Sequence, residues 1–197
     1  IGAGDVPILL LPGSRREEIE RLLPPMLGAA ERLGAADPTR RFFLPVAGGV
    51  DEERIRRHLA ASTAEVTLTH DARYALMGLA RAAMATSGTV VMEAALMGLP
   101  AVVLYRMSAL SYLIGRLLVD VPRFSLPNIL LGETFETELL QGAVQPDRIA
   151  AEMEKIIADG ADRRYVTERL SRAAAMLGAP HAARRVAEKI LALGRSA

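Results

Sequence analysis

The chain has 197 residues, of which 51% are hydrophobic, and its 24 Lys and Arg residues balance 23 Asp and Glu residues to a formal net charge of +1. This composition indicates a folded domain rather than a disordered tail, and the lack of a basic excess argues against nucleic-acid binding. Cysteine is absent, which excludes disulfides, thiolate chemistry and Cys-ligated zinc. No run approaches the roughly 18 apolar residues of a membrane span, so we expect a cytoplasmic protein. The chain begins at Ile1, and we expect it to be part of a longer protein.

The first half of the chain alternates short apolar runs with helical patterns. Strands are predicted at 8–11, 41–46, 66–69, 82–85 and 101–104, and helices at 17–33, 51–61, 72–80 and 93–98. Pro24 and Pro25 are expected to kink or divide the first helix. This alternation predicts an α/β fold: a Rossmann-like, doubly wound, mostly parallel sheet with helices on both faces.

The second half is mainly helical in pattern. The sequence predicts a rigid turn over Ser125–Asn128 and helices at 108–119, 135–141, 147–158, 162–177 and 181–193. The last two helices are separated by Gly178, Ala179 and Pro180, which we interpret as a hinge.

A polar turn follows the apolar run 82–85 and precedes a helix-forming run. Ser87 and Thr89 are good N-cap residues around Gly88, and the first N–H groups of the helix are left free. Free N–H groups and the helix dipole favour an anion, most often phosphate. Glu93 lies one turn further on, where a carboxylate can accept hydrogen bonds from sugar hydroxyls. The alternative is a capping box that only closes the helix, although a spacing of four rather than three weakens it.

A second polar turn, Pro12–Arg15, follows the apolar run 8–11. The Arg15 guanidinium could pair with a phosphate, or it could be an exposed residue of a helix cap. Ser14 is either a plain N-cap or a ligand. Because both turns follow parallel strands, we expect them to converge on one crevice at the carboxyl edge of the sheet.

Other polar residues carry weaker signals. Asn128 follows a proline, and Asn in a turn usually bonds to its own backbone. Glu138 and Gln141 are three apart and would share one face of the predicted helix 135–141, where such pairs are usually solvated. The sequence has no Asp-x-Asp pair, and its three histidines are scattered: His58, His70 and His181. We therefore expect no metal and no cofactor.

Six short sequence motifs, each weak alone, together indicate a specific protein family. They are Leu-Pro-Gly-Ser-Arg at 11–15, Leu-Pro-Val-Ala at 44–47, Ser-Gly-Thr-x-x-x-Glu at 87–93, Tyr-Arg at 105–106, Leu-Pro-Asn at 126–128 and Glu-Leu-Leu-Gln at 138–141. In this order and spacing the chain resembles the lipid-A-disaccharide synthase family from residue 8 to about 160. Within the third motif, where the family usually has a small residue and Leu, this chain has Val90-Val91-Met92. These substitutions keep the positions apolar.

The resemblance implies an inverting glycosyltransferase with the two-domain GT-B architecture. Such an enzyme joins UDP-2,3-diacylglucosamine to 2,3-diacylglucosamine 1-phosphate, and these two lipids are the expected partners. The chain would be the C-terminal half, with residues 1–160 as the donor-binding domain and 161–197 as helices that cross towards a separate N-terminal domain. The general base would lie in that other domain, so no catalytic residue is identified here.

The resemblance also implies a set of donor-binding residues. Ser14 and Arg15 would approach the diphosphate, Ser87 to Thr89 would hold it, and Glu93 would bond the ribose hydroxyls. Three further residues fall on family motif positions near the donor, with roles that the sequence does not fix. The substrate-binding set is therefore Ser14, Arg15, Ser87, Gly88, Thr89, Glu93, Asn128, Glu138 and Gln141.

Two segments bear on location and assembly. The apolar, Arg-bearing segment 108–119 suits contact with acyl chains or with the surface of the inner membrane, and a core helix of the domain is an equal alternative. Apolar positions within 180–197 would fold back on the domain or pack against another copy, which predicts self-association.

Two other functions stay open at this stage. One is a different GT-B enzyme, such as a UDP-GlcNAc 2-epimerase or another UDP-sugar transferase. The other is a non-catalytic module that binds a UDP-sugar.

Overall fold

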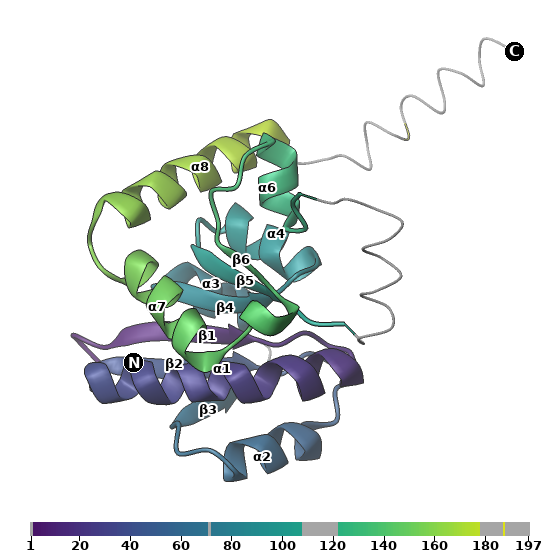
Figure 1. The fold of residues 1–197 in the computed structure, drawn as a ribbon, viewed down its shortest axis with the longest axis vertical. Helices are drawn as coiled ribbons and strands as arrows, with labels where there is room; N and C mark the ends of the chain where they lie inside the picture. The colour runs from purple at the N-terminus through teal and green to yellow at the C-terminus, as the bar shows by residue number, and fades with distance from the viewer. Residues whose placement is uncertain (1, 71, 108–121, 178–186, 188–197) are drawn as a thin grey trace, which may run out of the picture.

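A single parallel sheet organises the molecule (Figure 1). The computed structural model describes residues 2–70, 72–107, 122–177 and 187. Within this part of the chain six strands lie in the order β3-β2-β1-β4-β5-β6, and every neighbouring pair is parallel. The strands are β1 (Val6–Leu11), β2 (Arg40–Pro45), β3 (Val66–Thr69), β4 (Ala82–Thr86), β5 (Ala101–Tyr105) and β6 (Glu138–Leu140). The five predicted strands are confirmed within one or two residues, and so is the Rossmann-like fold class.

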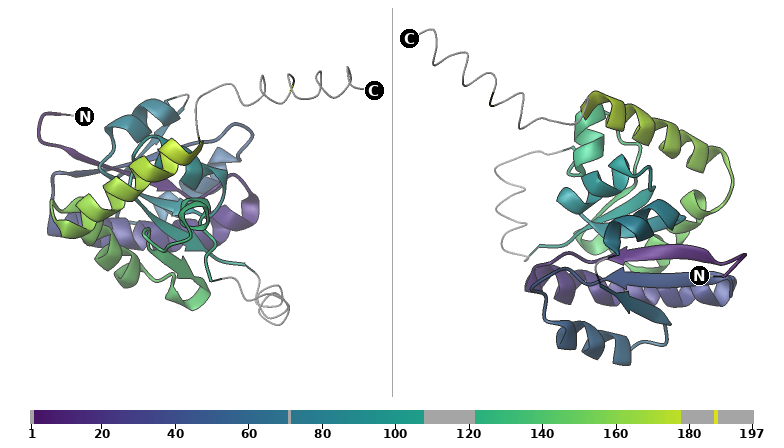
Figure 2. Two further views of the ribbon diagram at one scale, coloured as in Figure 1. Left: turned by 90° about the horizontal axis from the view of Figure 1, so that it is seen from above. Right: turned by 180° about the vertical axis from the view of Figure 1, so that it is seen from behind.

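Helices cover both faces of this sheet (Figure 2). They are α1 (Arg16–Ala36), α2 (Glu52–Ala60), α3 (Arg73–Leu79), α4 (Thr89–Leu96), α6 (Leu126–Leu131), α7 (Pro146–Ile157) and α8 (Ala161–Leu177), with a short 3₁₀ helix, η1 (Gln141–Ala143). The central strand β4 separates the two apolar clusters by the alternation of its side chains. Met84 packs in the cluster that holds α1 and α7, whereas Ala83 and Ala85 pack in the cluster that holds α3 and α4.

The strand order creates a topological switch point between β1 and β4. From β1 the chain first builds outward through β2 and β3, and it then returns to the other side of β1 to add β4, β5 and β6. At such a point the connections after the two central strands diverge to opposite faces and leave a crevice at the carboxyl edge. Both polar turns begin there, because one follows β1 and the other follows β4.

Helix α1 runs through Pro24 and Pro25 as one helix, so of the predicted kink or division, the division does not occur. A proline at position 25 removes the N–H that would bond to the carbonyl of Arg21, one turn back. Arg106 replaces that donor from another element, since its Nη1 lies 3.4 Å from the Arg21 carbonyl oxygen. Burial of Leu22, Leu23, Met26 and Leu27 in the core then holds the helix together.

Two predictions in the second half are corrected by the structure. The predicted helix 135–141 is instead β6 followed by η1, because Glu138–Leu140 completes the parallel ladder on β5. The predicted turn Ser125–Asn128 is the start of α6, since a proline in the first turn of a helix sacrifices no hydrogen bond.

The remaining helical predictions divide between described and undescribed residues. The helices at 147–158 and 162–177 are confirmed as α7 and α8. Helix α8 packs against α4, α6 and α7, so the first part of the predicted C-terminal segment lies on this domain (Figure 1). The predicted domain boundary at residue 160 stays a prediction, and the helices at 108–119 and 181–193 fall on residues outside the described part.

Candidate functional site

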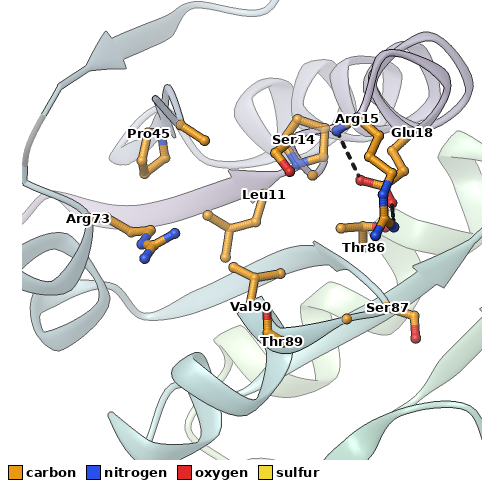
Figure 3. Close-up of a pocket in the computed structure, with 14 residues that line it drawn as sticks. Leu11, Ser14, Arg15, Glu18, Pro45, Arg73, Thr86, Ser87, Thr89 and Val90 are labelled. Carbon is orange, nitrogen blue, oxygen red and sulfur yellow. Dashed lines mark hydrogen bonds and ion pairs between the residues drawn. The ribbon is translucent and has the colours of Figure 1, made fainter. Parts of the chain in front are cut away.

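A cavity of about 300 Å³ opens at the switch point (Figure 3). Its walls are the end of β1 with the following turn, the end of β4 with the first residues of α4, and single residues from α1, β2, the loop after β2 and α3. Five of the residues singled out from the sequence line it together: Ser14, Arg15, Ser87, Gly88 and Thr89. The predicted meeting of the two turns therefore occurs, whereas the role of these residues as ligands stays a prediction.

The turn after β1 is shaped by the close approach of Gly13 to Glu18. Gly13 has φ 102°, and a Cβ there would lie 2.2 Å from Glu18 Oε2. The Glu18 carboxylate accepts hydrogen bonds from the Arg15 backbone N–H (3.3 Å) and from Arg15 Nη1 (2.8 Å). Arg15 is the N-cap of α1 and its side chain is 84% exposed, so the guanidinium stands at the mouth of the cavity and can reach a ligand.

The N-cap of α4, at the end of the turn after β4, is Gly88. The sequence had predicted Ser87 or Thr89 for this position. Gly88 has φ 156° and ψ −163°, a combination that is almost confined to glycine. The Ser87 hydroxyl instead donates to the carbonyl of Phe124 over 2.9 Å, and Thr89 is the first residue of the helix. Among the described residues no side chain caps α4, so the N–H groups of Thr89 and Val90, which line the cavity, are left without an intrahelical partner. That arrangement suits an anion.

Glu93 lies behind the cavity wall and does not line it, but it contacts a residue that does. Its Oε2 lies 3.1 Å from Nη2 of Arg73, the first residue of α3, and Arg73 lines the cavity opposite Arg15 (Figure 3). Sequence analysis missed Arg73, although its position just after the carboxyl end of β3 could have indicated it. The cavity thus has an arginine on each side, and each arginine is paired with a carboxylate.

Asn128 and Glu138 form a partly buried network away from the cavity lining. Asn128 is fully buried, its Oδ1 accepts from the N–H groups of Phe135 (3.0 Å) and Glu136 (3.1 Å), and its Nδ2 donates to the Glu136 carbonyl (2.9 Å). The same Nδ2 donates to Glu138 Oε1 over 2.7 Å. Glu138 also accepts from the N–H groups of Phe124 and Ser125. The network joins β6 to the start of α6, just behind the carbonyl that holds Ser87.

The side-chain amide of Gln141 forms two hydrogen bonds with the backbone of Met107, just after β5, as the backbone of a neighbouring strand would. Its Oε1 accepts from Met107 N–H (3.2 Å) and its Nε2 donates to the Met107 carbonyl (3.3 Å). Arg106 donates to the carbonyls of Gln141 and Val144, at 3.2 and 2.6 Å. Gln141 therefore fixes the chain that leaves β5, and it does not line the cavity.

A buried carboxyl that the sequence analysis did not single out lies beside this network. Glu136 is 1% exposed, accepts from Ala101 N–H at 3.3 Å and receives a long hydrogen bond of 3.4 Å from the Ser125 hydroxyl. Burial raises the pKa of Glu136 to about 8, and the nearby Glu138 carboxylate adds to the rise. The Glu136 side chain is therefore mostly protonated at pH 7, and it adds little negative charge behind the part of the cavity wall that Ser87 forms.

The described residues contain neither a metal-binding cluster nor a membrane-spanning helix. In residues 2–70, 72–107 and 122–177, no group of three or more His, Asp or Glu side chains is arranged to hold a metal ion. Over the same ranges, no helix combines the length and the apolar character needed to cross a membrane.

Comparison with known proteins identifies the family. The family model described as lipid-A-disaccharide synthetase matches residues 3–191. The chain belongs to this family. The lipid-A-disaccharide synthase of Anaeromyxobacter dehalogenans (strain 2CP-1) is 45% identical over 95% of the chain, and that of Syntrophus aciditrophicus is 44% identical over 94%. Each alignment covers 49% of the relative, so the chain spans about half the length of these lipid-A-disaccharide synthases.

Solved structures place the fold of this lipid-A-disaccharide synthase family member among GT-B proteins. The kitacinnamycin glycotransferase aligns with a TM-score of 0.62 and 21% identity, over 96% of this chain and 44% of that one. The UDP-GlcNAc 2-epimerase of Neisseria meningitidis aligns with a TM-score of 0.56 and 16% identity, over 90% of this chain and 44% of that one. At these identities the likeness concerns the fold alone.

Proposed function

We propose that this chain is the donor-binding half of a lipid-A-disaccharide synthase. The observation that carries the proposal is the cavity at the switch point, where the N-terminal ends of α1 and α4 meet between two arginines. In this proposal the diphosphate of a UDP-sugar lies across the two turns. The sugar is 2,3-diacylglucosamine, and the acceptor is 2,3-diacylglucosamine 1-phosphate.

The cavity would act on the leaving group. As the 6-hydroxyl of the acceptor attacks the anomeric carbon, the bond to the diphosphate breaks and negative charge grows on UDP. Fixed donors aimed at such charge lower a barrier by typically about 2.7–4 kcal/mol each. In this proposal the N–H groups at the start of α4, together with the guanidinium of Arg15, supply this stabilisation. The general base that takes the hydroxyl proton belongs to the other half of the enzyme in this proposal.

The residues outside the cavity lining take supporting roles in the proposal. Glu93 reaches the ribose hydroxyls once a nucleotide is bound, with Arg73 as its partner in the free protein. Asn128 and Glu138 hold the backbone behind Ser87, and Gln141 holds the chain that leaves β5. Contact with the inner membrane through 108–119 and self-association through 180–197 stay predictions, since these segments lie outside the described residues.

Calorimetry with uridine diphosphate in EDTA tests the nucleotide site. Saturable binding of UDP that is unchanged by EDTA is expected, because backbone N–H groups and arginines supply the positive potential. Binding that appears only after Mg²⁺ is added would contradict the proposed site.

A transfer assay tests the assignment as one half of the enzyme. The chain alone is expected to form no disaccharide. Adding the part of the Anaeromyxobacter dehalogenans synthase that this chain does not match should restore transfer. Turnover by the purified chain alone would contradict the assignment. UDP binding without any restored transfer would favour the non-catalytic module.

A further inference from the structure

We propose that the Thr86 hydroxyl is a phosphate-binding group on the α1 side of the cavity. Thr86 is the last residue of β4, it is 4% exposed, and it lines the cavity (Figure 3). Its Oγ1 is buried and has no hydrogen-bond partner among the described residues. The proposal rests on the proposed function for the identity of the nucleotide, but not for the presence of an anion.

The position of Thr86 gives the direction of its side chain. Ala82 and Met84 of the same strand pack with α1 and α7, so Thr86, two residues further on, points to that face. Ser87 and Thr89 belong to the turn that enters α4 on the opposite face. A ligand that lies across the switch point therefore meets Thr86 from the α1 side and the α4 N-terminus from the other side.

An unpartnered buried hydroxyl needs an explanation, because buried polar groups in proteins are almost always hydrogen-bonded. Two other threonines in the described part of the chain are satisfied, since Thr137 Oγ1 donates to Glu152 and Thr167 Oγ1 donates to the Arg163 carbonyl, and Thr86 shares its lack of a partner with Thr69. A ligand with acceptor oxygens would satisfy Thr86. Phosphate oxygens fit best, since the hydroxyl lies at the carboxyl end of the central strand, next to the first turns of two helices.

Thr69 offers a matched control in the same protein. Its Oγ1 is also buried without a partner in the part of the chain that the structure describes, and Thr69 is also the last residue of its strand, β3. It does not line the cavity. A Thr→Val change at either position replaces the hydroxyl by a methyl group of nearly the same size, so the two variants differ chiefly in whether the lost hydroxyl faces the cavity.

The test is calorimetry of Thr86→Val, Thr86→Ser and Thr69→Val with UDP, inorganic pyrophosphate and uridine. Thr86→Val should bind UDP and pyrophosphate about tenfold more weakly than the unchanged chain, the factor expected for one hydrogen bond to a charged oxygen. Thr86→Ser should bind them as the unchanged chain does, and Thr69→Val should also be unchanged. Melting temperatures of all variants show whether each is folded.

The other outcomes are equally definite. If Thr86→Val melts at or above the temperature of the unchanged chain and binds UDP equally well, the hydroxyl is merely unsatisfied and the proposal is overturned. An equal loss for uridine would place the contact on the nucleoside and also overturn it. Pyrophosphate binding that depends on Thr86 without UDP selectivity supports this inference and contradicts the proposed function. A chain that binds none of the three probes contradicts both.

Discussion

The side-chain amide of Asn128 donates to Glu138 Oε1 over 2.7 Å, and that carboxylate also accepts from the N–H groups of Phe124 and Ser125. The amide of Asn128 uses all its hydrogen-bonding capacity within the protein, since its Oδ1 accepts two backbone N–H groups. The carbonyl of Phe124 in turn holds the Ser87 hydroxyl at the cavity wall. Asn128 and Glu138, which the sequence motifs place near the donor, thus bond to each other and to the backbone behind the cavity wall.

Asn128→Ala is predicted to destabilise the fold. The change leaves the N–H groups of Phe135 and Glu136 without their acceptor, which should cost on the order of 2–4 kcal/mol of unfolding free energy. Urea denaturation measures the change. Gln145→Ala removes an exposed amide with a single long bond and should lie within about 0.5 kcal/mol of the unchanged chain. A stable Asn128→Ala variant with selectively weakened UDP binding would instead support direct contact.

The stability of the chain is predicted to depend on pH through Glu136. In the unfolded chain this carboxyl titrates near 4.5, whereas in the folded protein burial raises its pKa to about 8. The folded state therefore holds the extra proton between these values, and this contribution is full below pH 4.5 and is lost as the pH rises towards 8.

Glu136→Gln removes that titration while keeping a neutral side chain of the same shape. The unfolding free energy of the variant relative to the unchanged chain should rise by up to about 1.4 kcal/mol per pH unit across this window. Denaturation curves between pH 5 and 8 measure it. Parallel pH profiles for the two proteins would show that Glu136 is already ionised in the folded state.

Gly13→Ala is predicted to damage both stability and UDP binding. A Cβ at φ 102° is strained and would meet Glu18 Oε2 at 2.2 Å, so the turn must shift at a cost of about 1–3 kcal/mol. The matched change Gly142→Ala meets no atom within 4 Å and should leave binding unchanged. Thermal melts and UDP titrations of both variants are the measurements, and equal behaviour of the two would contradict the close approach.

Glu93→Gln is predicted to change how the site distinguishes ribose. The unchanged chain should bind UDP more tightly than 2′,3′-dideoxy-UDP, because the carboxylate bonds to the ribose hydroxyls. The variant should show a clearly smaller preference for ribose, because an amide oxygen is a weaker acceptor than a carboxylate, while its affinity for inorganic pyrophosphate stays the same. If the preference for ribose survives in full in Glu93→Gln, the carboxylate serves only to hold Arg73.

The sequence predicted the sheet well because its buried parallel strands are continuous apolar runs. Ile8–Leu11 and Ala82–Ala85 are almost completely inaccessible, and short apolar runs between polar turns are typical of buried strands in parallel sheets. It failed at Glu138–Leu140, where three residues carry no measurable period and the strand depends on β5 for its pairing. Local pattern also misled at Pro25, since the compensating donor, Arg106, comes from the far end of β5.

The candidate site was predictable where the chain turns and unpredictable where side chains meet across elements. The turns at Gly13 and Gly88 follow strand ends, so their meeting follows from topology. The pairing of Arg73 with Glu93 joins α3 to α4, and the burial of Thr86 depends on α1 and the sheet together. Neither leaves a periodic or motif signal in the sequence.

A crystal structure of the chain with UDP, grown in EDTA, tests the central claim most directly. We predict that the diphosphate lies between the Gly13–Arg15 turn and the first turn of α4, with the Thr86 hydroxyl and the N–H groups of α4 within hydrogen-bond distance of its oxygens. UDP bound elsewhere on the chain, or a diphosphate held through a divalent metal instead of these groups, would contradict the account.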